Sequence, residues 1–306
     1  MAFLKLIRWP NLLMIAFVQY LIRFSLIEYL NVPHVLDHLN YFFGVVCSVS
    51  LAAAGYIIND LHDLETDKIN KPQRRVIGTK ISETSAKQLY LGLNILALTT
   101  GYLISKASGM PSLWMLPLVA IGILYFYAIS LKKIPFVGNF VVSLLTALPV
   151  ILVAFFDLLP GLNPENQDFV KEVMRIISAY ALFAFWTNLI REMVKDAEDI
   201  KGDKKQGYST LAVILGKEQI RFVILFFTIV LISFTGFYNY YLFSSDKLSS
   251  WYILLAINAP ILYFMYSIMA AKTSKDFKGS SSIIKIIMLT GICSMLVFTL
   301  SSIINS

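Results

Sequence analysis

The chain has 306 residues, of which 57% are hydrophobic and only 15% are charged, and its formal net charge is +7. A soluble domain carries about 25% charged residues, so this composition excludes an ordinary soluble protein and indicates a polytopic membrane protein. The two cysteines, Cys47 and Cys293, both lie inside apolar runs, which argues against a disulfide framework or a thiolate metal site.

Nine apolar segments are long enough to cross a bilayer, which takes about 20 helical residues. We therefore predict an all-α transmembrane bundle. Its first span follows Lys5 and Arg8 without a small-residue cleavage site, so we interpret it as a retained helix rather than a signal peptide. The predicted spans cover residues 12–30, 40–60, 88–106, 112–130, 137–157, 173–193, 219–243, 250–271 and 283–303.

The charges of the loops predict the orientation, because cytoplasmic loops carry an excess of Lys and Arg. With the N-terminus inside, 21 of the 26 basic residues fall in cytoplasmic segments. We therefore expect a cytoplasmic N-terminus and an outer C-terminus in the cell (inner) membrane. The basic loops suit anionic membrane lipid and phosphorylated substrates, and they require no nucleic acid.

Two acidic motifs follow the second and the sixth predicted spans, so both emerge at the cytoplasmic face. The first runs from Asn59 to Asp67 and the second from Asp196 to Asp203. Each contains the pattern D-x-x-D-x-x-x-D, formed by Asp60, Asp63 and Asp67 and by Asp196, Asp199 and Asp203. The constant offset hints at duplicated four-helix halves, about 1–135 and 136–270 plus a final helix, within one domain of residues 1–306.

These motifs predict a magnesium site at the cytoplasmic side of the bundle. Carboxylates beside a bilayer are costly and ask for a compensating cation. Mg²⁺ takes oxygen ligands and often bridges to the phosphates of a substrate. Asn59, Asp63 and Asp67 are spaced to share one face of a helix, so the clusters indicate a metal–diphosphate site at the membrane surface. A single Asp is more often an interfacial charge, but two equivalent sets argue against that.

Basic residues beside the motifs are candidates for binding phosphate. Arg74 lies in the loop after the second span, and Arg191 and Lys195 stand just before the second motif. The planar fork of arginine matches phosphate oxygens. The alternative for each of them is a role in membrane topology alone.

Other polar residues stand at the ends of predicted spans. Tyr127 and Lys132 end the fourth span and Asn139 begins the fifth, where such residues either face the site or anchor the helix at the interface. Asn11 begins the first span, where it contacts substrate or caps the helix. A metal–diphosphate site beside an apolar cavity suits the ionisation of an allylic diphosphate, because metal ions stabilise the departing group and the cavity excludes water.

The motifs resemble those of a known family. N-D-x-x-D-x-x-x-D followed by D-K-I-N-K-P-x-R, at 59–74, resembles the first signature of the UbiA superfamily of intramembrane prenyltransferases, and D-A-E-D-I-K-G-D-K-x-x-G-x-x-T-L, at 196–211, resembles the second. R-W-P-N at 8–11 and Y-x-x-x-x-K at 127–132 fit as well. Arg75 departs from the family, in which many members have proline there.

The resemblance implies Mg²⁺-dependent transfer of a prenyl group from a prenyl diphosphate donor to a lipophilic acceptor. It implies that Mg²⁺ and the diphosphate are held by Asn59, Asp60, Asp63, Asp67, Asp196, Asp199 and Asp203. It also implies phosphate contacts for Arg74, Lys132 and Arg191, and we expect Asp63, Asp199, Lys132 and Tyr127 to take part in catalysis. We expect Asn11, Arg74, Arg191, Lys195 and Asn139 to bind substrate.

The stretch R-E-M-V-K-D-A-E-D-I-K-G-D at 191–203 looks most like the archaeal-type digeranylgeranylglyceryl phosphate synthases. Those attach a geranylgeranyl chain to the free hydroxyl of geranylgeranylglyceryl phosphate. Prenyltransferases of quinone biosynthesis, which act on aromatic acids, share the aspartates and stay open as an alternative. A membrane transporter also carries acids within the membrane, but here the acids lie at helix ends beside a basic loop.

Overall fold

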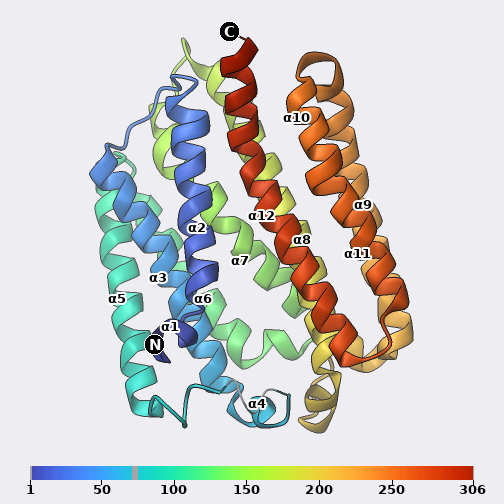
Figure 1. Ribbon diagram of the computed structural model, residues 1–306. Helices are drawn as coiled ribbons and strands as arrows, with labels where there is room; N and C mark the ends of the chain where they lie inside the picture. The colour runs from blue at the N-terminus through green and yellow to red at the C-terminus, as the bar shows by residue number, and fades with distance from the viewer. Residues whose placement is uncertain (1, 71–74, 306) are drawn as a thin grey trace. The chain divides into compact units, whose positions relative to one another are not determined.

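The computed structural model describes residues 2–70 and 75–305 (Figure 1). Over these residues the chain is helical and forms no strand, although Ile77 and Ile81 pair in an isolated bridge. The predicted all-α fold is therefore confirmed for the part of the chain that the structure describes.

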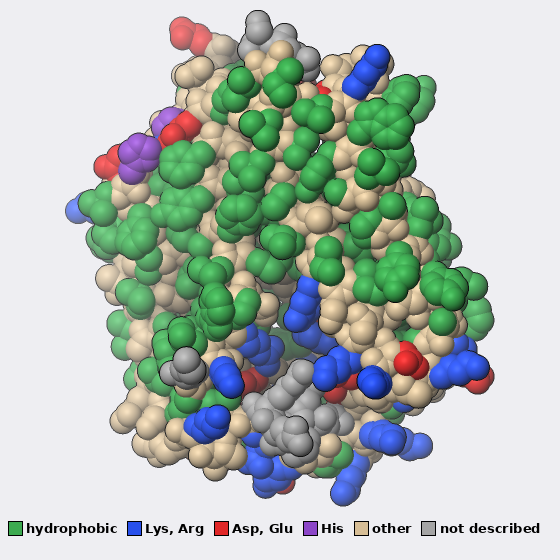
Figure 2. Space-filling model, in the orientation of Figure 1, with side chains coloured by type: hydrophobic (Ala, Val, Ile, Leu, Met, Phe, Trp, Pro, Cys, Tyr) green, Lys and Arg blue, Asp and Glu red, His purple; other side chains and the backbone are tan. Residues whose placement is uncertain are grey.

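Eight helical segments within the described residues are long and apolar enough to cross a membrane. They are Trp9–Glu28, His38–His62, Pro111–Ile129, Val137–Gly161, Gln167–Lys205, Leu211–Ser245, Lys247–Ala270 and Ser274–Ile304. Many large hydrophobic side chains are accordingly exposed, and Figure 2 shows hydrophobic side chains on the surface in green.

The remaining predicted span, 88–106, coincides with α5 (Glu83–Ala107), which is not among the eight. Its 25 residues extend over about 38 Å, so length is not what excludes it. It is less apolar, with Asn94, Thr100 and Ser105 buried along it, each bonded to a carbonyl one turn earlier. Nine crossings and the orientation of the bundle stay predictions.

The chain divides into two compact units. Unit 1 comprises residues 1–22, 31–132 and 148–178, and unit 2 comprises 23–30, 133–147 and 179–306. The first acidic motif belongs to unit 1 and the second to unit 2. A single domain built from two duplicated halves stays a prediction.

Helix α3 is the centre of unit 1, where it packs mainly against α5 and also against α6 and α2. Asp37 caps its N-terminus by accepting a hydrogen bond from the backbone N–H of Asn40. Gly101 allows α5 and α6 to approach closely, because a Cβ at this position would lie 2.5 Å from the ring of Pro117 on α6. The elements are α1 (Ala2–Leu6), α2 (Trp9–Leu21), α3 (His38–His62), α4 (Leu64–Asn70), α5, η3 (Pro111–Trp114), α6 (Met115–Ile129), most of η4 (Leu131–Lys133), the end of α7 (Val137–Val153), η5 (Ala154–Leu158), η6 (Leu159–Gly161) and the start of α8 (Gln167–Lys205).

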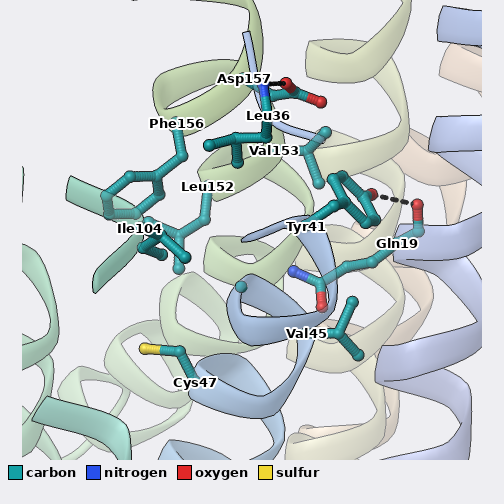
Figure 3. Close-up of a pocket in the computed structure, with 11 residues that line it drawn as sticks. Gln19, Leu36, Tyr41, Val45, Cys47, Ile104, Leu152, Val153, Phe156 and Asp157 are labelled. Atoms are coloured by element: carbon teal, nitrogen blue, oxygen red, sulfur yellow. Dashed lines mark hydrogen bonds between the residues drawn. The ribbon is translucent and has the colours of Figure 1, made fainter. Parts of the chain in front are cut away.

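A small cavity lies inside unit 1, between Gln19, Tyr41 and Asp157 (Figure 3). The side-chain N–H of Gln19 donates to Ser48 and to the carbonyl of Pro149, which ties three helical segments together. The cavity offers about 20 Å³, room for about one water molecule. It is therefore too small to receive a prenyl chain.

Unit 2 is built from the long helices of the C-terminal half. Gly291 of α12 allows a close approach to α8, since a Cβ there would lie 2.1 Å from the ring of Phe183. Tyr180 and Ser294 join the same two helices by a 2.8 Å hydrogen bond. Besides parts of α7 and α8, the unit contains η1 (Ile22–Glu28), α9 (Leu211–Ser245), α10 (Lys247–Tyr252), η7 (Ile253–Asn258), α11 (Ala259–Ala270) and α12 (Ser274–Asn305).

Candidate active site

The first acidic motif lies where α3 ends. The last helical residue is His62, and Asp63 follows with φ −99° and ψ 9°, a sparsely populated backbone conformation. Asp67 stands on the next helix, α4, so the motif does not form the single unbroken stripe that its spacing predicts. The backbone bonds from Asp63 N–H to Asn59 O and from Asp67 N–H to Asp63 O still preserve the four-residue spacing.

Lys132 joins the side chains of Asn59 and Asp63 in unit 1. Its ammonium group donates to Asp63 Oδ1 at 2.6 Å and to Asn59 Oδ1 at 3.3 Å. Asn59 also donates from Nδ2 to Asp63 Oδ2 at 2.9 Å. The Lys132 side chain is only 9% exposed. Three predicted site residues from distant parts of the sequence are thus brought together, with two oxygens facing one cation.

Arg8 and Tyr56 belong to the same end of unit 1, although the sequence did not mark them as site residues. Arg8 donates to Asp60 Oδ1 at 2.7 Å, and its guanidinium carbon lies 4.7 Å from the centre of the Tyr56 ring. Asn11 donates to the Tyr56 hydroxyl at 3.1 Å. The four-residue spacing of Tyr56 and Asp60 on α3 was the signal that could have revealed this cluster.

Tyr127 lies half-buried on α6, one turn before the segment that carries Lys132. Arg74 lies outside the described residues. Within the described ranges, no three His, Cys, Asp or Glu side chains lie close enough together to hold a metal ion. The donor chemistry of the first motif nevertheless fits magnesium, because the oxygens of Asn59 and Asp63 already converge on one cation.

The second motif lies within one continuous helix, as its spacing predicts. Helix α8 runs for 39 residues, from Gln167 to Lys205, and a turn with Gly207 at φ 71° follows it. The predicted site residues of this part of the chain therefore all project from one helix, and they are Arg191, Lys195, Asp196, Asp199 and Asp203.

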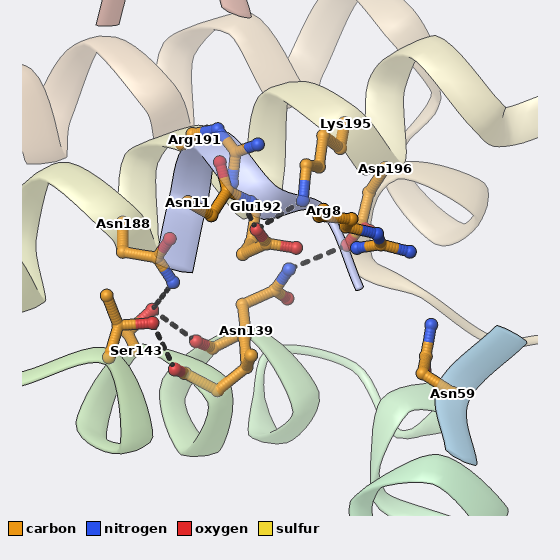
Figure 4. A network of polar contacts seen from close by, with 12 residues as sticks. Arg8, Asn11, Asn59, Asn139, Ser143, Asn188, Arg191, Glu192, Lys195 and Asp196 are labelled. Atoms are coloured by element: carbon orange, nitrogen blue, oxygen red, sulfur yellow. Dashed lines mark hydrogen bonds and ion pairs between the residues drawn. The ribbon is translucent and has the colours of Figure 1, made fainter. Parts of the chain in front are cut away.

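Asn139, at the start of α7, holds one carboxylate of this motif. Its Nδ2 donates to Asp196 Oδ2 at 2.8 Å (Figure 4). One turn further along α7, the buried Ser143 donates to the Asn139 carbonyl at 2.6 Å and accepts from Asn188 of α8 at 3.4 Å. These buried bonds fix α7 against α8 beside Asp196, so Asn139 has a position that orients a predicted metal ligand.

Arg191 and Lys195 share one acceptor on α8. Oε1 of Glu192 accepts from Arg191 at 3.1 Å and from Lys195 at 2.6 Å (Figure 4). The Nε–H of Arg191 is buried and has no hydrogen-bond partner among the residues that the structure describes. A buried donor of this kind is suited to bind an anion.

The family model of the UbiA prenyltransferase family matches residues 21–290. The chain belongs to the UbiA prenyltransferase family. With its apolar helices, this membership makes the UbiA chain an integral membrane protein and a prenyltransferase. The prediction of an enzyme rather than a transporter is therefore confirmed.

Two curated relatives of this UbiA chain carry the same name. Digeranylgeranylglyceryl phosphate synthase of Sulfolobus acidocaldarius is 34% identical over 85% of the chain and 86% of the relative. The protein of the same name from Saccharolobus solfataricus is 33% identical over 82% and 81%, respectively.

Solved structures share the fold. A structure of digeranylgeranylglyceryl phosphate synthase has a TM-score of 0.66 at 23% identity, with 97% of each chain covered. A UbiA homolog from Archaeoglobus fulgidus bound to GPP and Mg²⁺ has a TM-score of 0.56 at 17% identity, covering 97% of this chain and all (100%) of that one.

Proposed function

We propose that the UbiA chain transfers a geranylgeranyl group from its diphosphate to the free hydroxyl of geranylgeranylglyceryl phosphate. The product is an ether lipid, made at the cytoplasmic face of the cell membrane. The observation that carries this proposal is the pair of cations on α8, of which Arg191 stands five residues before Asp196 and Lys195 directly before it. An acceptor with a phosphate of its own needs such cations in addition to those that serve the donor. The name shared by the curated relatives supports the same acceptor.

Each acidic motif would supply oxygen ligands for Mg²⁺, with Asn59, Asp60, Asp63 and Asp67 in unit 1 and Asp196, Asp199 and Asp203 in unit 2. The bound metal would neutralise charge on the departing diphosphate. The Mg²⁺ and GPP bound to the Archaeoglobus homolog support this proposal. Seven oxygen donors and no soft ligand are the set that suits a hard divalent cation.

The residues of the chain would act on both substrates. Lys132, Tyr127, Arg74 and Arg191 bind and orient phosphate groups, and the apolar helices keep water from the allylic cation. The bond between C1 and the diphosphate oxygen breaks, a bond forms between C1 and the acceptor oxygen, and the hydroxyl proton is released. Asn139 orients Asp196 through the 2.8 Å hydrogen bond described above.

A competition between acceptors tests the proposed function. Purified protein receives geranylgeranyl diphosphate, Mg²⁺ and equal amounts of geranylgeranylglyceryl phosphate and 4-hydroxybenzoate, and the products are separated by mass. We expect the prenylated glyceryl phosphate, because only that acceptor offers a phosphate to the cations of α8. Prenylated 4-hydroxybenzoate as the sole product would assign the chain to quinone biosynthesis instead.

Arg191→Lys should reduce kcat/KM at least about tenfold, a loss of about 1.4 kcal/mol, although the charge is kept. The reason is that lysine lacks the planar fork that meets two phosphate oxygens at once. Steady-state kinetics measure the loss. Arg175→Lys is the matched control, since Arg175 lies on the same helix in an exposed ion pair with Glu172 and should tolerate the change. Wild-type kinetics in both variants would leave Arg191 with a role in topology alone.

A further inference from the structure

We propose that Glu192 is a positioning residue that holds Arg191 and Lys195 together as the binding site for the phosphate of the acceptor. The role rests on the proposed function, in which the acceptor is a prenylglyceryl phosphate. It assigns the two cations to the phosphate of the acceptor rather than to the donor diphosphate.

Glu192 lies between two cations that would otherwise repel each other. Its Oε1 accepts from Arg191 Nη1 at 3.1 Å and from Lys195 Nζ at 2.6 Å. The three side chains are only 12%, 15% and 25% exposed for Arg191, Glu192 and Lys195, so solvent screens the repulsion weakly. The shared carboxylate offsets that repulsion and restricts two long side chains that otherwise keep many rotamers.

The cluster still has a donor that can bind an anion. The buried Nε–H of Arg191 has no hydrogen-bond partner among the described residues. A phosphate oxygen would satisfy this donor with a charge-assisted hydrogen bond. A carboxylate would by itself repel a phosphate, and its place in this site is explained by its hydrogen bonds to Arg191 and Lys195.

Within this cluster Arg191 lies farthest from the predicted donor site, whereas Lys195 directly precedes Asp196. Arg191 precedes Asp199 by eight residues, about 12 Å along the helix axis. For the reaction, the acceptor oxygen has to approach the allylic carbon of the donor to about 3 Å. A few bonds separate the acceptor oxygen from the acceptor's phosphorus, and a few separate the allylic carbon from the donor's nearer phosphorus. The two anionic groups therefore have to be bound on the order of 10 Å apart. An anion at Arg191 and a diphosphate at Asp199 meet that requirement.

Glu192→Ala should raise the KM for geranylgeranylglyceryl phosphate at least about tenfold, or about 1.4 kcal/mol, and leave the KM for geranylgeranyl diphosphate within about twofold. Glu192→Gln keeps an oxygen that accepts from Lys195 and should restore part of the loss. Glu172→Ala is the matched control, because Glu172 forms the same kind of ion pair, with Arg175 at 2.6 Å, near the other end of α8, and it should change neither KM.

Geranylgeranylglycerol, which lacks the phosphate, separates a binding role from a structural one. With this acceptor, the wild type and Glu192→Ala should have equal kcat/KM. An equal loss with both acceptors, an unchanged acceptor KM or a raised donor KM would each overturn the role of Glu192 while leaving the proposed function intact. If the wild type transfers nothing to geranylgeranylglyceryl phosphate, the proposed function and the role of Glu192 both fail.

Discussion

Asp63→Ala and Asp199→Ala should each reduce kcat at least about a hundredfold, a barrier increase of about 3 kcal/mol. We expect this because each carboxylate is a proposed oxygen ligand for the metal that neutralises the departing diphosphate. In unit 1 the loss of Asp63 also removes the acceptor that Lys132 contacts at 2.6 Å. Single-turnover measurements with radiolabelled donor give the rate of the chemical step.

Controls separate a lost ligand from a lost fold. Asp63→Asn keeps a hydrogen-bond acceptor for Lys132 and removes the charge, so it should be inserted as well as the wild type and remain nearly inactive. Asp168→Ala is the matched control for Asp199, since Asp168 lies on the same helix with a side chain that is 98% exposed, and it should keep full activity. Near wild-type turnover in Asp63→Ala or Asp199→Ala would leave that aspartate an ordinary surface charge.

Removal of divalent cations should abolish prenyl transfer, and Mg²⁺ should restore it. The proposed ligands are seven oxygen donors without a thiolate or an imidazole, a set that favours hard cations. Dialysis against EDTA, followed by titration with Mg²⁺ and measurement of product, checks this directly. Activity that survives exhaustive chelation would show that the basic residues alone bind and activate the diphosphate.

The measurement has two controls. Mn²⁺, which accepts the same oxygen ligands, should restore part of the activity. Ca²⁺ prefers longer bonds and more ligands and should restore less. The order of these three ions at saturating concentration thus tests whether the site is built for a small octahedral cation.

Much of the fold could be predicted, because span length and hydropathy depend on local sequence. Each predicted span coincides with a helix, and the second acidic motif lies within the continuous α8, as its spacing indicates. The break at Asp63 was not predictable, since it depends on the backbone conformation of one residue. The buried polar residues of α5 lower its hydropathy, so hydropathy alone does not decide whether this helix crosses the membrane.

The sequence was sufficient to predict many residues of the candidate site, but only some of the contacts between them. The spacing marked Asn59 and Asp63 as site residues. The structure adds that Lys132, which is 69 residues from Asp63 in the sequence, donates a hydrogen bond to each of them. Arg8 and Tyr56 were missed because their relation to Asp60 and Asn11 depends on how α2 packs against α3. Glu192 was not among the predicted site residues, because its bonds to two neighbouring cations depend on rotamers that sequence spacing does not determine.

The mass of the product formed from geranylgeranyl diphosphate and geranylgeranylglyceryl phosphate tests the central claim most directly. Purified wild-type protein in detergent or vesicles, supplied with Mg²⁺ and both substrates, should give one lipid that carries a second geranylgeranyl group, with one diphosphate released per product. Because the new bond is an ether, the lipid should survive mild alkaline hydrolysis. Formation of geranylgeraniol alone, with the glyceryl phosphate recovered unchanged, would contradict the account.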